Sequence, residues 1–186
     1  MARVGVSQPV YAPYSIVAGA VKYSGAVTMG KATSFDISLD SASDNNLYAD
    51  NAIAETDSQF GGGTLTVGLD DLYDAAVIAM LGVTSNNGEL IRKSGVSSPY
   101  VGVGGIVKHI QSGTTRYTGV ILTKVQFQDP GISVTTQGET IDWQTPEISA
   151  TIMRDDTTDA VWMRQKTFDT EAAAASYIST FFAAST

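Results

Sequence analysis

Cysteine is absent from the 186 residues of the sequence, and histidine occurs once, as His109. Without thiols there is no disulfide framework, no zinc ribbon or iron–sulfur cluster held by thiolates, and no thiol nucleophile. No second histidine is present to share a metal ion with His109 or to act with a nucleophile. We therefore interpret His109 as a structural or surface residue rather than a catalytic or metal-ligating one.

Basic side chains are also scarce, with 11 Lys and Arg against 19 Asp and Glu, which gives a net charge of −8 when His109 is neutral. Proteins that hold nucleic acid by neutralising phosphates need clustered lysine and arginine in net excess. The composition argues against a protein of that kind. It leaves open the passage of DNA along a surface that does not grip it.

Long apolar runs are missing as well, because the longest extends only from Ala75 to Leu81. A membrane-spanning helix needs about 18 consecutive apolar residues. The first ten residues lack the charged and apolar regions of a secretory signal. We expect a soluble chain whose residues 1–186 form one domain, in which residues 1–15 are an N-terminal arm.

The charges that are present fall into blocks along the sequence. Residues 1–35 carry +3 with no acid, 36–89 carry −10 with no base, 90–128 carry +5 with no acid, and 129–186 carry −6. These blocks either interleave on the surface of a monomer or form a self-complementary surface, in which an acidic patch meets a basic patch of another copy.

Apolar residues recur mostly at every second position, which predicts half-buried strands at 35–39 and 65–69. Residues 100–110 and 116–127 flank a Ser-Gly break and predict an antiparallel pair. In the second of these strands one face carries Tyr117, Ile121, Val125 and Phe127, and the other carries Val120 and Leu122. Such a strand is covered on both faces, by a core on one side and, in one interpretation, by a neighbouring subunit on the other.

Later in the chain, strands are expected around Ile148–Ile152 and Val161–Lys166, with Pro146 at an edge, bulge or strand switch. Two segments have helical spacing instead. The first is 70–82, where Asp70 or Asp71 is the expected N-cap and Gly82 the expected C-terminal stop. The second is the alanine-rich segment 170–184.

Residues 40–63 form a long polar and acidic connection between two predicted strands. Connections longer than about 12–15 residues are usually functional or disordered. Because this one contains the apolar residues Leu47 and Tyr48, we predict a loop or hairpin arm that orders against something else.

Motifs for catalysis fail on inspection. Gly25–Lys31 begins like a phosphate loop, but Ala32 replaces the hydroxyl residue that would hold magnesium, and a strand pattern follows. Gly102, Gly104 and Gly105 do not complete a dinucleotide motif, and we interpret them as sites of backbone approach or sheet bending. The carboxylates at 155–159 resemble a polar turn, with a calcium site as a less favoured alternative. We expect no catalytic residue, no cofactor and no metal.

An ordered set of segments across nearly the whole chain resembles the major tail proteins that build the tail tubes of long-tailed bacteriophages. These segments are Asn45–Asp50, Ala54–Thr56, Gly61–Gly63, Leu65–Leu72, Met80–Gly82, Pro99–Gly104, Thr115–Thr118, Lys124–Phe127, Thr136–Gly138 and Gln144–Ser149. The three glycines at 102, 104 and 105 depart from the bulkier residues expected in that stretch.

The resemblance implies a non-enzymatic virion protein with a mainly β fold. The expected architecture is an antiparallel β-sandwich or partly closed β-barrel with one flanking helix, the 40–63 arm and a C-terminal helix. It implies hexameric rings that stack into a tube for DNA ejection, assembled in the bacterial host cytoplasm. The implied partners are other copies of the chain, the tape-measure protein, the tail terminator and tail-tip proteins, with DNA passing through unbound.

Two sets of residues are candidates for this assembly. Acids of block 36–89 or of block 129–159 are predicted to line the bore, whereas the basic residues of 90–128 mostly face neighbouring subunits. The candidate bore residues are Asp36, Asp40, Asp142 and Glu147. The candidate contacts between subunits or rings are Asn45, Asn46, Leu47, Tyr48, Asp50, Glu55, Phe60, Arg92, Lys93, Arg116, Phe181 and Phe182.

Other functions stay open. A stand-alone β-sandwich binding module, of the adhesin or carbohydrate-binding type, would share the strands and the acidic loops. A tube protein of a phage-derived injection particle would share the assembly. A carboxylate-based hydrolase would instead need two carboxyl groups that face each other across a cleft.

Overall fold

A computed structural model describes residues 2–41, 45–49, 52–57, 60–131 and 145–183. Its strands, in chain order, are β1 (Ala2–Val17), β2 (Ala20–Tyr23), β3 (Val27–Thr28), β4 (Ala32–Ser41), β5 (Asn45–Ala49), β6 (Ala52–Asp57), β7 (Phe60–Leu69), β8 (Thr84–Asn86), β9 (Glu89–Ile91), β10 (Tyr100–Gln111), β11 (Thr114–Phe127), β12 (Glu147–Met153) and β13 (Met163–Phe168). Its helices are α1 (Asp74–Leu81) and α2 (Glu171–Ala183). The expected mainly β, antiparallel class is confirmed.

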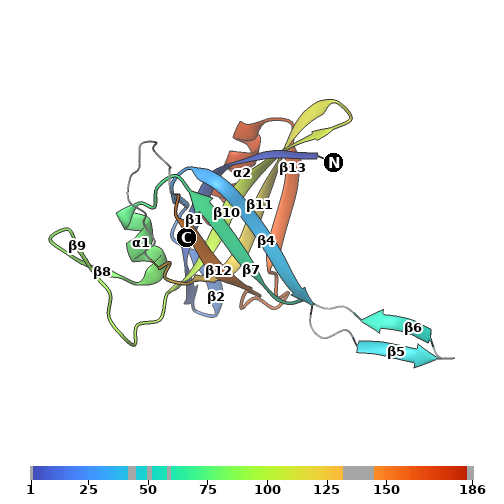
Figure 1. Cartoon of the computed structure of the whole chain (residues 1–186), viewed down its shortest axis with the longest axis horizontal. Helices are drawn as coiled ribbons and strands as arrows, with labels where there is room; N and C mark the ends of the chain where they lie inside the picture. The colour runs from blue at the N-terminus through green and yellow to red at the C-terminus, as the bar shows by residue number, and fades with distance from the viewer. Residues whose placement is uncertain (1, 42–44, 50–51, 58–59, 132–144, 184–186) are drawn as a thin grey trace, which may run out of the picture.

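The main sheet has the order β2-β1-β10-β11-β12-β7-β4, and every pairing in it is antiparallel. The sheet is not closed into a barrel, and its arrangement is consistent with a sandwich (Figure 1). One edge of β11 pairs with β10, and its other edge pairs with β13 along 117–122 and with β12 along 124–127. β12 and β13 therefore form one line beside β11, interrupted by residues 154–162.

Two apolar cores lie on opposite faces of the β1–β10–β11 layer. The larger core contains Leu65, Val67, Ile148 and Ile152 from β7 and β12, together with the buried face of α1. The smaller core lies under α2 and contains, among others, Ala12, Tyr23, Ile106, Ile121, Ala174, Ile178 and Phe182. The cover over the second face of β11 is thus α2 of the same chain, which corrects the interpretation that a neighbouring subunit supplies it.

A β-bulge changes which residues of β11 share a face. Val101 pairs with Val125 and Val103 pairs with Leu122, so two residues of β11 lie opposite Gly102. Val125 and Phe127 consequently join Leu122 in the larger core, whereas Ile121 lies in the smaller one. The predicted sharing of a face by Ile121, Val125 and Phe127 is wrong because strict alternation ends at the bulge.

The glycines of β10 allow α2 to approach the sheet. A Cβ atom on Gly104 would lie 2.5 Å from Cγ2 of Ile178, and one on Gly102 would lie 2.5 Å from Cε1 of Phe182. These distances are too short for any real Cβ, which confirms the prediction of close approach at these two positions.

The N-terminal segment is a strand rather than the predicted arm. β1 pairs with β10 along most of its length and with β2 and β3 on its other edge. Its alternation is broken between Ser7 and Val10, where the register shifts and Gln8 has φ 51°. This bulge precedes Val10 and Ala12, which pack in the smaller core.

The predicted helix at 70–82 is shorter at its start than expected. α1 begins at Asp74 with Tyr73 as its N-cap, and no side chain caps it. Asp70 instead accepts hydrogen bonds from the backbone N–H groups of Lys31 and Asp71, at 2.7 and 2.9 Å. Gly82 ends the helix in the left-handed region, with φ 67°, as predicted. Neither α1 nor α2, the helices of the described residues, is long and apolar enough to cross a membrane.

Two hairpins extend from opposite ends of the molecule (Figure 1). The β5–β6 hairpin continues outward beyond the β4–β7 pair, and its own strands are paired from Asn45↔Asp57 to Ala49↔Ala52. At the other end, β8 and β9 are joined by Asn87 and Gly88, which have φ 49° and 85° as an Asn-Gly hairpin turn requires. The 40–63 connection is therefore a hairpin in its described part.

Candidate functional site

Three of the four predicted bore acids lie on one face of the sheet. Along β4 the side chains of Phe35 and Ile37 pack against the larger core, so Asp36 and Asp40 lie on the opposite, exposed face. Glu147 begins β12 on the same face, because its neighbour Ile148 is buried. Asp142 lies outside the described residues.

The rest of this face consists of small hydroxyl side chains. Across the three strands, Asp36 pairs with Thr66, which pairs with Ser149, and Ser38 pairs with Thr64, which pairs with Thr151. β4, β7 and β12 contain no lysine or arginine at all. We call this outer surface of β4, β7 and β12 the acidic face.

The predicted contact residues of the arm fall on the two strands of the outer hairpin. Asn45, Asn46, Leu47 and Tyr48 belong to β5, and Glu55 belongs to β6, opposite Leu47. Asp50 lies outside the described residues. The hairpin segment 45–57 carries three acids and no base. It is therefore an acidic projection with apolar residues in its sequence.

Phe60, another predicted contact, already has a partner in its own chain. Its ring stacks on Trp162 with a centroid separation of 4.4 Å and an interplanar angle of 2°. This stack joins the start of β7 to the residue that precedes β13. It fixes the base of the outer hairpin to the body of the protein.

The predicted basic contacts differ in how much they are already paired. Arg92 follows β9 and forms an ion pair with Asp129 at 2.6 Å, and Arg116 of β11 forms one with Asp169. Lys93 is exposed and forms no ion pair among the described residues. Lys93 is thus the most available cation of the three.

The two phenylalanines of α2 have different environments. Phe182 is 0% exposed, with its ring 5.1 Å from that of Tyr23. It is a core residue of its own chain, so its prediction as a contact between subunits is wrong. Phe181 is half-buried and packs against Tyr23 and Arg164.

The carboxylates at 155–159 organise the loop that interrupts the β12–β13 line. Asp155 Oδ1 accepts hydrogen bonds from the N–H groups of Thr157 and Val161, at 3.2 and 3.0 Å, and from the Thr157 hydroxyl at 2.6 Å. This is the polar turn that the sequence predicted. No cluster of potential metal ligands occurs among the described residues.

Asp156 fastens the same loop to the sheet. Its Oδ2 accepts hydrogen bonds from Lys124 Nζ and from the Tyr14 hydroxyl, each at 2.6 Å. Lys124 is only 12% exposed and lies over the ring of Tyr100, 4.5 Å from its centroid. The hydrogen bonds from Lys124 and Tyr14 hold the pKa of the Asp156 carboxyl below its usual range, whereas burial raises the pKa of the Tyr14 hydroxyl.

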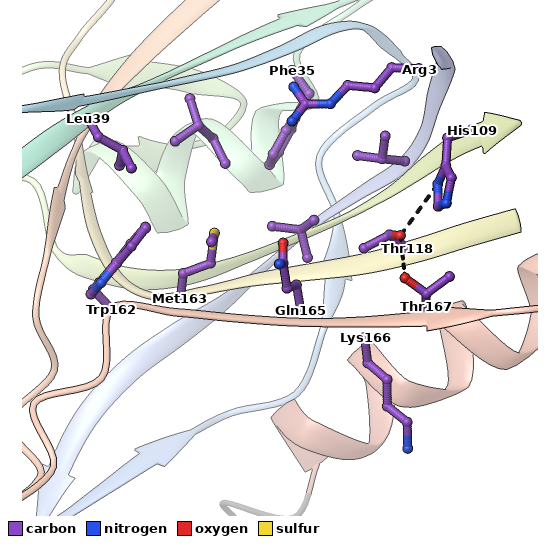
Figure 2. Close-up of a pocket in the computed structure, with 13 residues that line it drawn as sticks. Arg3, Phe35, Leu39, His109, Thr118, Trp162, Met163, Gln165, Lys166 and Thr167 are labelled. Carbon is purple, nitrogen blue, oxygen red and sulfur yellow. Dashed lines mark hydrogen bonds between the residues drawn. The ribbon is translucent and has the colours of Figure 1, made fainter. Parts of the chain in front are cut away.

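His109 is a buried residue, 1% exposed, at one end of a cavity of about 430 Å³ (Figure 2). Its Nδ1 lies 3.5 Å from the Thr118 hydroxyl, which lies 2.9 Å from the Thr167 hydroxyl. Its Nε2 has no hydrogen-bond partner among the described residues. The cavity lies between β4 on one side and β10, β11 and β13 on the other, with Trp162 at the end away from His109.

The sequence did not reveal the Lys124–Asp156–Tyr14 cluster or this cavity, because their members come from distant segments. The β8–β9 hairpin did have a local signal, the Asn87-Gly88 pair. Comparison of the sequence with protein-family models finds no match, and comparison with curated proteins finds none. The functional argument therefore depends on the geometry described above.

Proposed function

We propose that this chain is a structural subunit that assembles into stacked rings and forms the tail tube of a bacteriophage, through which DNA leaves the capsid. The observation that carries the proposal is the β5–β6 hairpin, which extends beyond the body of the protein (Figure 1). An isolated two-stranded hairpin is marginally stable in water. A second copy of the chain would supply the surface on which this hairpin orders.

Unpaired strand edges support lateral joining of copies. Within the described residues, β4 pairs only with β7, and β13 pairs only with β11. Exposed edges of this kind are templates for pairing with another chain. Joining such edges around an axis would produce a ring, whose bore is wider than the interior of any single small sandwich.

The acidic face supports a role as the wall of the bore. Duplex DNA carries about one negative charge per 1.7 Å of its axis, and a basic wall would retain it through counterion release. A wall of carboxylates and hydroxyls repels the duplex and lets it slide. Asp36, Asp40 and Glu147 would therefore line the bore in the assembled tube.

Charge at the two ends supports stacking of rings. The outer hairpin is acidic, and Lys93 follows the β8–β9 hairpin at the opposite end of the molecule (Figure 1). A contact between unlike ends of successive copies is heterologous, and heterologous contacts propagate into open stacks. The acidic hairpin of one ring would then meet the basic end of the next.

Electron microscopy of the purified chain tests this proposal, with rings or tubes as the expected result. Replacing residues 45–57 by a short Gly-Ser linker keeps Phe60 on Trp162, so the variant should fold as the parent does and form no tubes. Lys93→Glu should shorten or abolish stacks, whereas Lys108→Glu, a matched reversal of an exposed lysine on β10, should not. Normal tubes from the hairpin deletion, or a persistent monomer of the parent at high concentration, would refute the proposal.

If the chain is instead a stand-alone binding module, the parent protein should remain a monomer at every concentration. Sedimentation velocity distinguishes the two functions directly. A tube protein of a phage-derived injection particle would form the same assemblies, and the presence or absence of DNA in the native particle separates it from a phage tail.

A further inference from the structure

We propose that the outer hairpin is hinged to the body of the protein at Gly61 and Gly62, and that the stack of Phe60 on Trp162 is the latch that holds it in one direction. Their role in assembly rests on the proposed function, in which this hairpin docks on a second copy. The hinge and the latch themselves belong to a single copy of the chain.

The sheet loses its third strand close to the point where the hairpin begins. β12 pairs with β7 as far as Gly63, which lies opposite Ile152. Beyond Gly63, within the described residues, the β4–β7 ribbon continues as two strands to the pair Ser41↔Phe60 and leads to the hairpin (Figure 1). Two-stranded ribbons twist more strongly than wider sheets and are marginally stable by themselves. This stretch is therefore the least supported part of the ribbon.

A glycine bulge lies in the same stretch. Asp40 pairs with Gly62, and Ser41 pairs with Phe60. β7 thus contains one extra residue, Gly61, at this step of the ladder. Gly62 has φ 140°, a conformation that residues with a side chain rarely adopt. Gly61 and Gly62 bring neither side-chain packing nor a restricted backbone to the ribbon, as is typical of the small residues at a hinge.

Trp162 belongs to the body of the protein and is held there by its backbone. The backbone N–H of Thr123 donates to the carbonyl of Trp162 at 3.2 Å, and the Thr123 hydroxyl donates to the carbonyl of Val161 at 2.6 Å. Thr123 lies on β11 and is 0% exposed. The N–H of Val161 in turn donates to Asp155 Oδ1 at 3.0 Å. Trp162 is therefore fixed on the opposite side of the hinge from Phe60.

The stack of Phe60 on Trp162 crosses the hinge. The ring centroids are 4.4 Å apart, the rings are 2° from parallel, and both residues pack at the margin of the larger core. An aromatic pair contributes favourable energy beyond the area that it buries. The stack therefore restrains a hairpin that the glycines leave free to swing. A hairpin that already has one direction loses less conformational freedom when it docks on a partner.

Spin labels test this directly, because the chain contains no cysteine and two introduced cysteines carry the only labels. One pair crosses the hinge, with Ala52→Cys in β6 and Thr151→Cys in β12. The control pair, Lys108→Cys with Thr151→Cys, lies within the body. Distance distributions are recorded by double electron–electron resonance on protein dilute enough to be monomeric in sedimentation velocity. With the stack intact, we expect each pair to give one narrow maximum.

Variants of the stack are then compared with both label pairs. Trp162→Leu removes the ring, so the distribution across the hinge should broaden and lose its single maximum, while that of the control pair stays narrow. Trp162→Phe keeps an aromatic ring and should keep the maximum. Phe60→Leu removes the other ring and should repeat the result of Trp162→Leu. Urea unfolding verifies that each variant is folded before it is labelled.

Three results would overturn the proposal. The first is a narrow maximum across the hinge in folded Trp162→Leu and Phe60→Leu, which would mean that the backbone alone fixes the hairpin. The second is a broad distribution across the hinge in the parent, which would mean that the stack does not hold the hairpin. The third is equal broadening of the control pair in the variants, which would place the motion in the body.

Electron microscopy of the same variants separates the latch from the proposed function. Trp162→Leu should form fewer tubes than the parent, and Trp162→Phe should form as many. A parent that forms no tubes, but whose hairpin broadens as expected in Trp162→Leu, would refute the proposed function and support the latch. A parent that forms tubes, with unbroadened distances in Trp162→Leu and Phe60→Leu, would refute the latch alone.

Discussion

Replacing Gly104 by alanine tests whether α2 packs on β10 as described. The added Cβ would lie 2.5 Å from Cγ2 of Ile178 and 3.1 Å from Cγ2 of Val10. Overpacking of a core costs about 1–3 kcal/mol, and alanine regains roughly 0.5–1 kcal/mol relative to glycine within a strand. We therefore expect the free energy of unfolding to fall by about 1–2 kcal/mol, measured by urea denaturation followed by circular dichroism.

Gly105 provides the matched control on the same strand. A Cβ atom there would lie 3.3 Å from the ring of Phe35, on the side of the sheet away from α2, and that ring borders the cavity and has room to shift. Gly105→Ala should therefore cause no loss of stability. A second test uses Ile178→Ala, because removing the clashing Cγ2 should abolish the cost of Gly104→Ala in the double variant. If Gly104→Ala and Gly105→Ala unfold alike and the double variant shows no coupling, α2 does not lie on this face.

Three further predictions concern the second core, the loop fastening and the buried imidazole. Phe182→Ala should lower the free energy of unfolding by about 3–5 kcal/mol, since the ring is fully buried. A loss no larger than that caused by substituting an exposed side chain would contradict the place of Phe182 in the core. Asp156→Asn should destabilise the protein at neutral pH. The pKa of Asp156 is lowered in the folded state by Lys124 and Tyr14. The stability it contributes is therefore present above the pKa of the unfolded state and is lost as the pH falls through the folded pKa. The difference in free energy of unfolding between the parent and Asp156→Asn, measured with urea, should vanish at low pH. A difference that grows on acidification would contradict the prediction. His109→Leu should leave stability unchanged or raise it by up to about 1 kcal/mol, because it removes an unpaired buried polar atom; a large loss in thermal unfolding would mean that Nε2 has a partner.

The strands whose alternation is unbroken were predictable from the sequence. Residues 35–39 and 65–69 alternate strictly, and they form parts of β4 and β7. The β10–β11 hairpin was predictable from its turn, where Ser112 and Gly113 have φ 50° and 79°. Prediction failed where a bulge changes the face of a strand, as at Gln8 in β1 and opposite Gly102 in β11. A single extra residue moves every later side chain of the strand to the opposite face of the sheet. The local sequence does not indicate where that residue is inserted.

The candidate surfaces were predictable only within one strand. Asp36 lies on the strand predicted at 35–39, and Asp40 shares its face because β4 continues past the predicted end to Ser41. Glu147 joins them because β12 pairs with β7, and that register depends on the whole sheet. The cavity was beyond prediction for the same reason, since its wall combines residues from β1, β4, β10, β11 and β13. The prediction for Phe182 was wrong because an apolar helix face can pack equally well against a neighbouring subunit or against the sheet of its own chain.

The interruption between β12 and β13 has a practical consequence for engineering the chain. Met153 pairs with Lys124 and Met163 pairs with Leu122, so the chain leaves β11 after Met153 and pairs with it again only two residues further along β11. The intervening loop is tied down at Asp155 and Asp156, whereas Thr158 and Asp159 at its tip are exposed. Lengthening the tip changes no pairing on either side. A peptide epitope or a fluorophore-accepting tag inserted between Thr158 and Asp159 would therefore be displayed without disturbing the sheet, giving a label for following each copy of the chain during assembly.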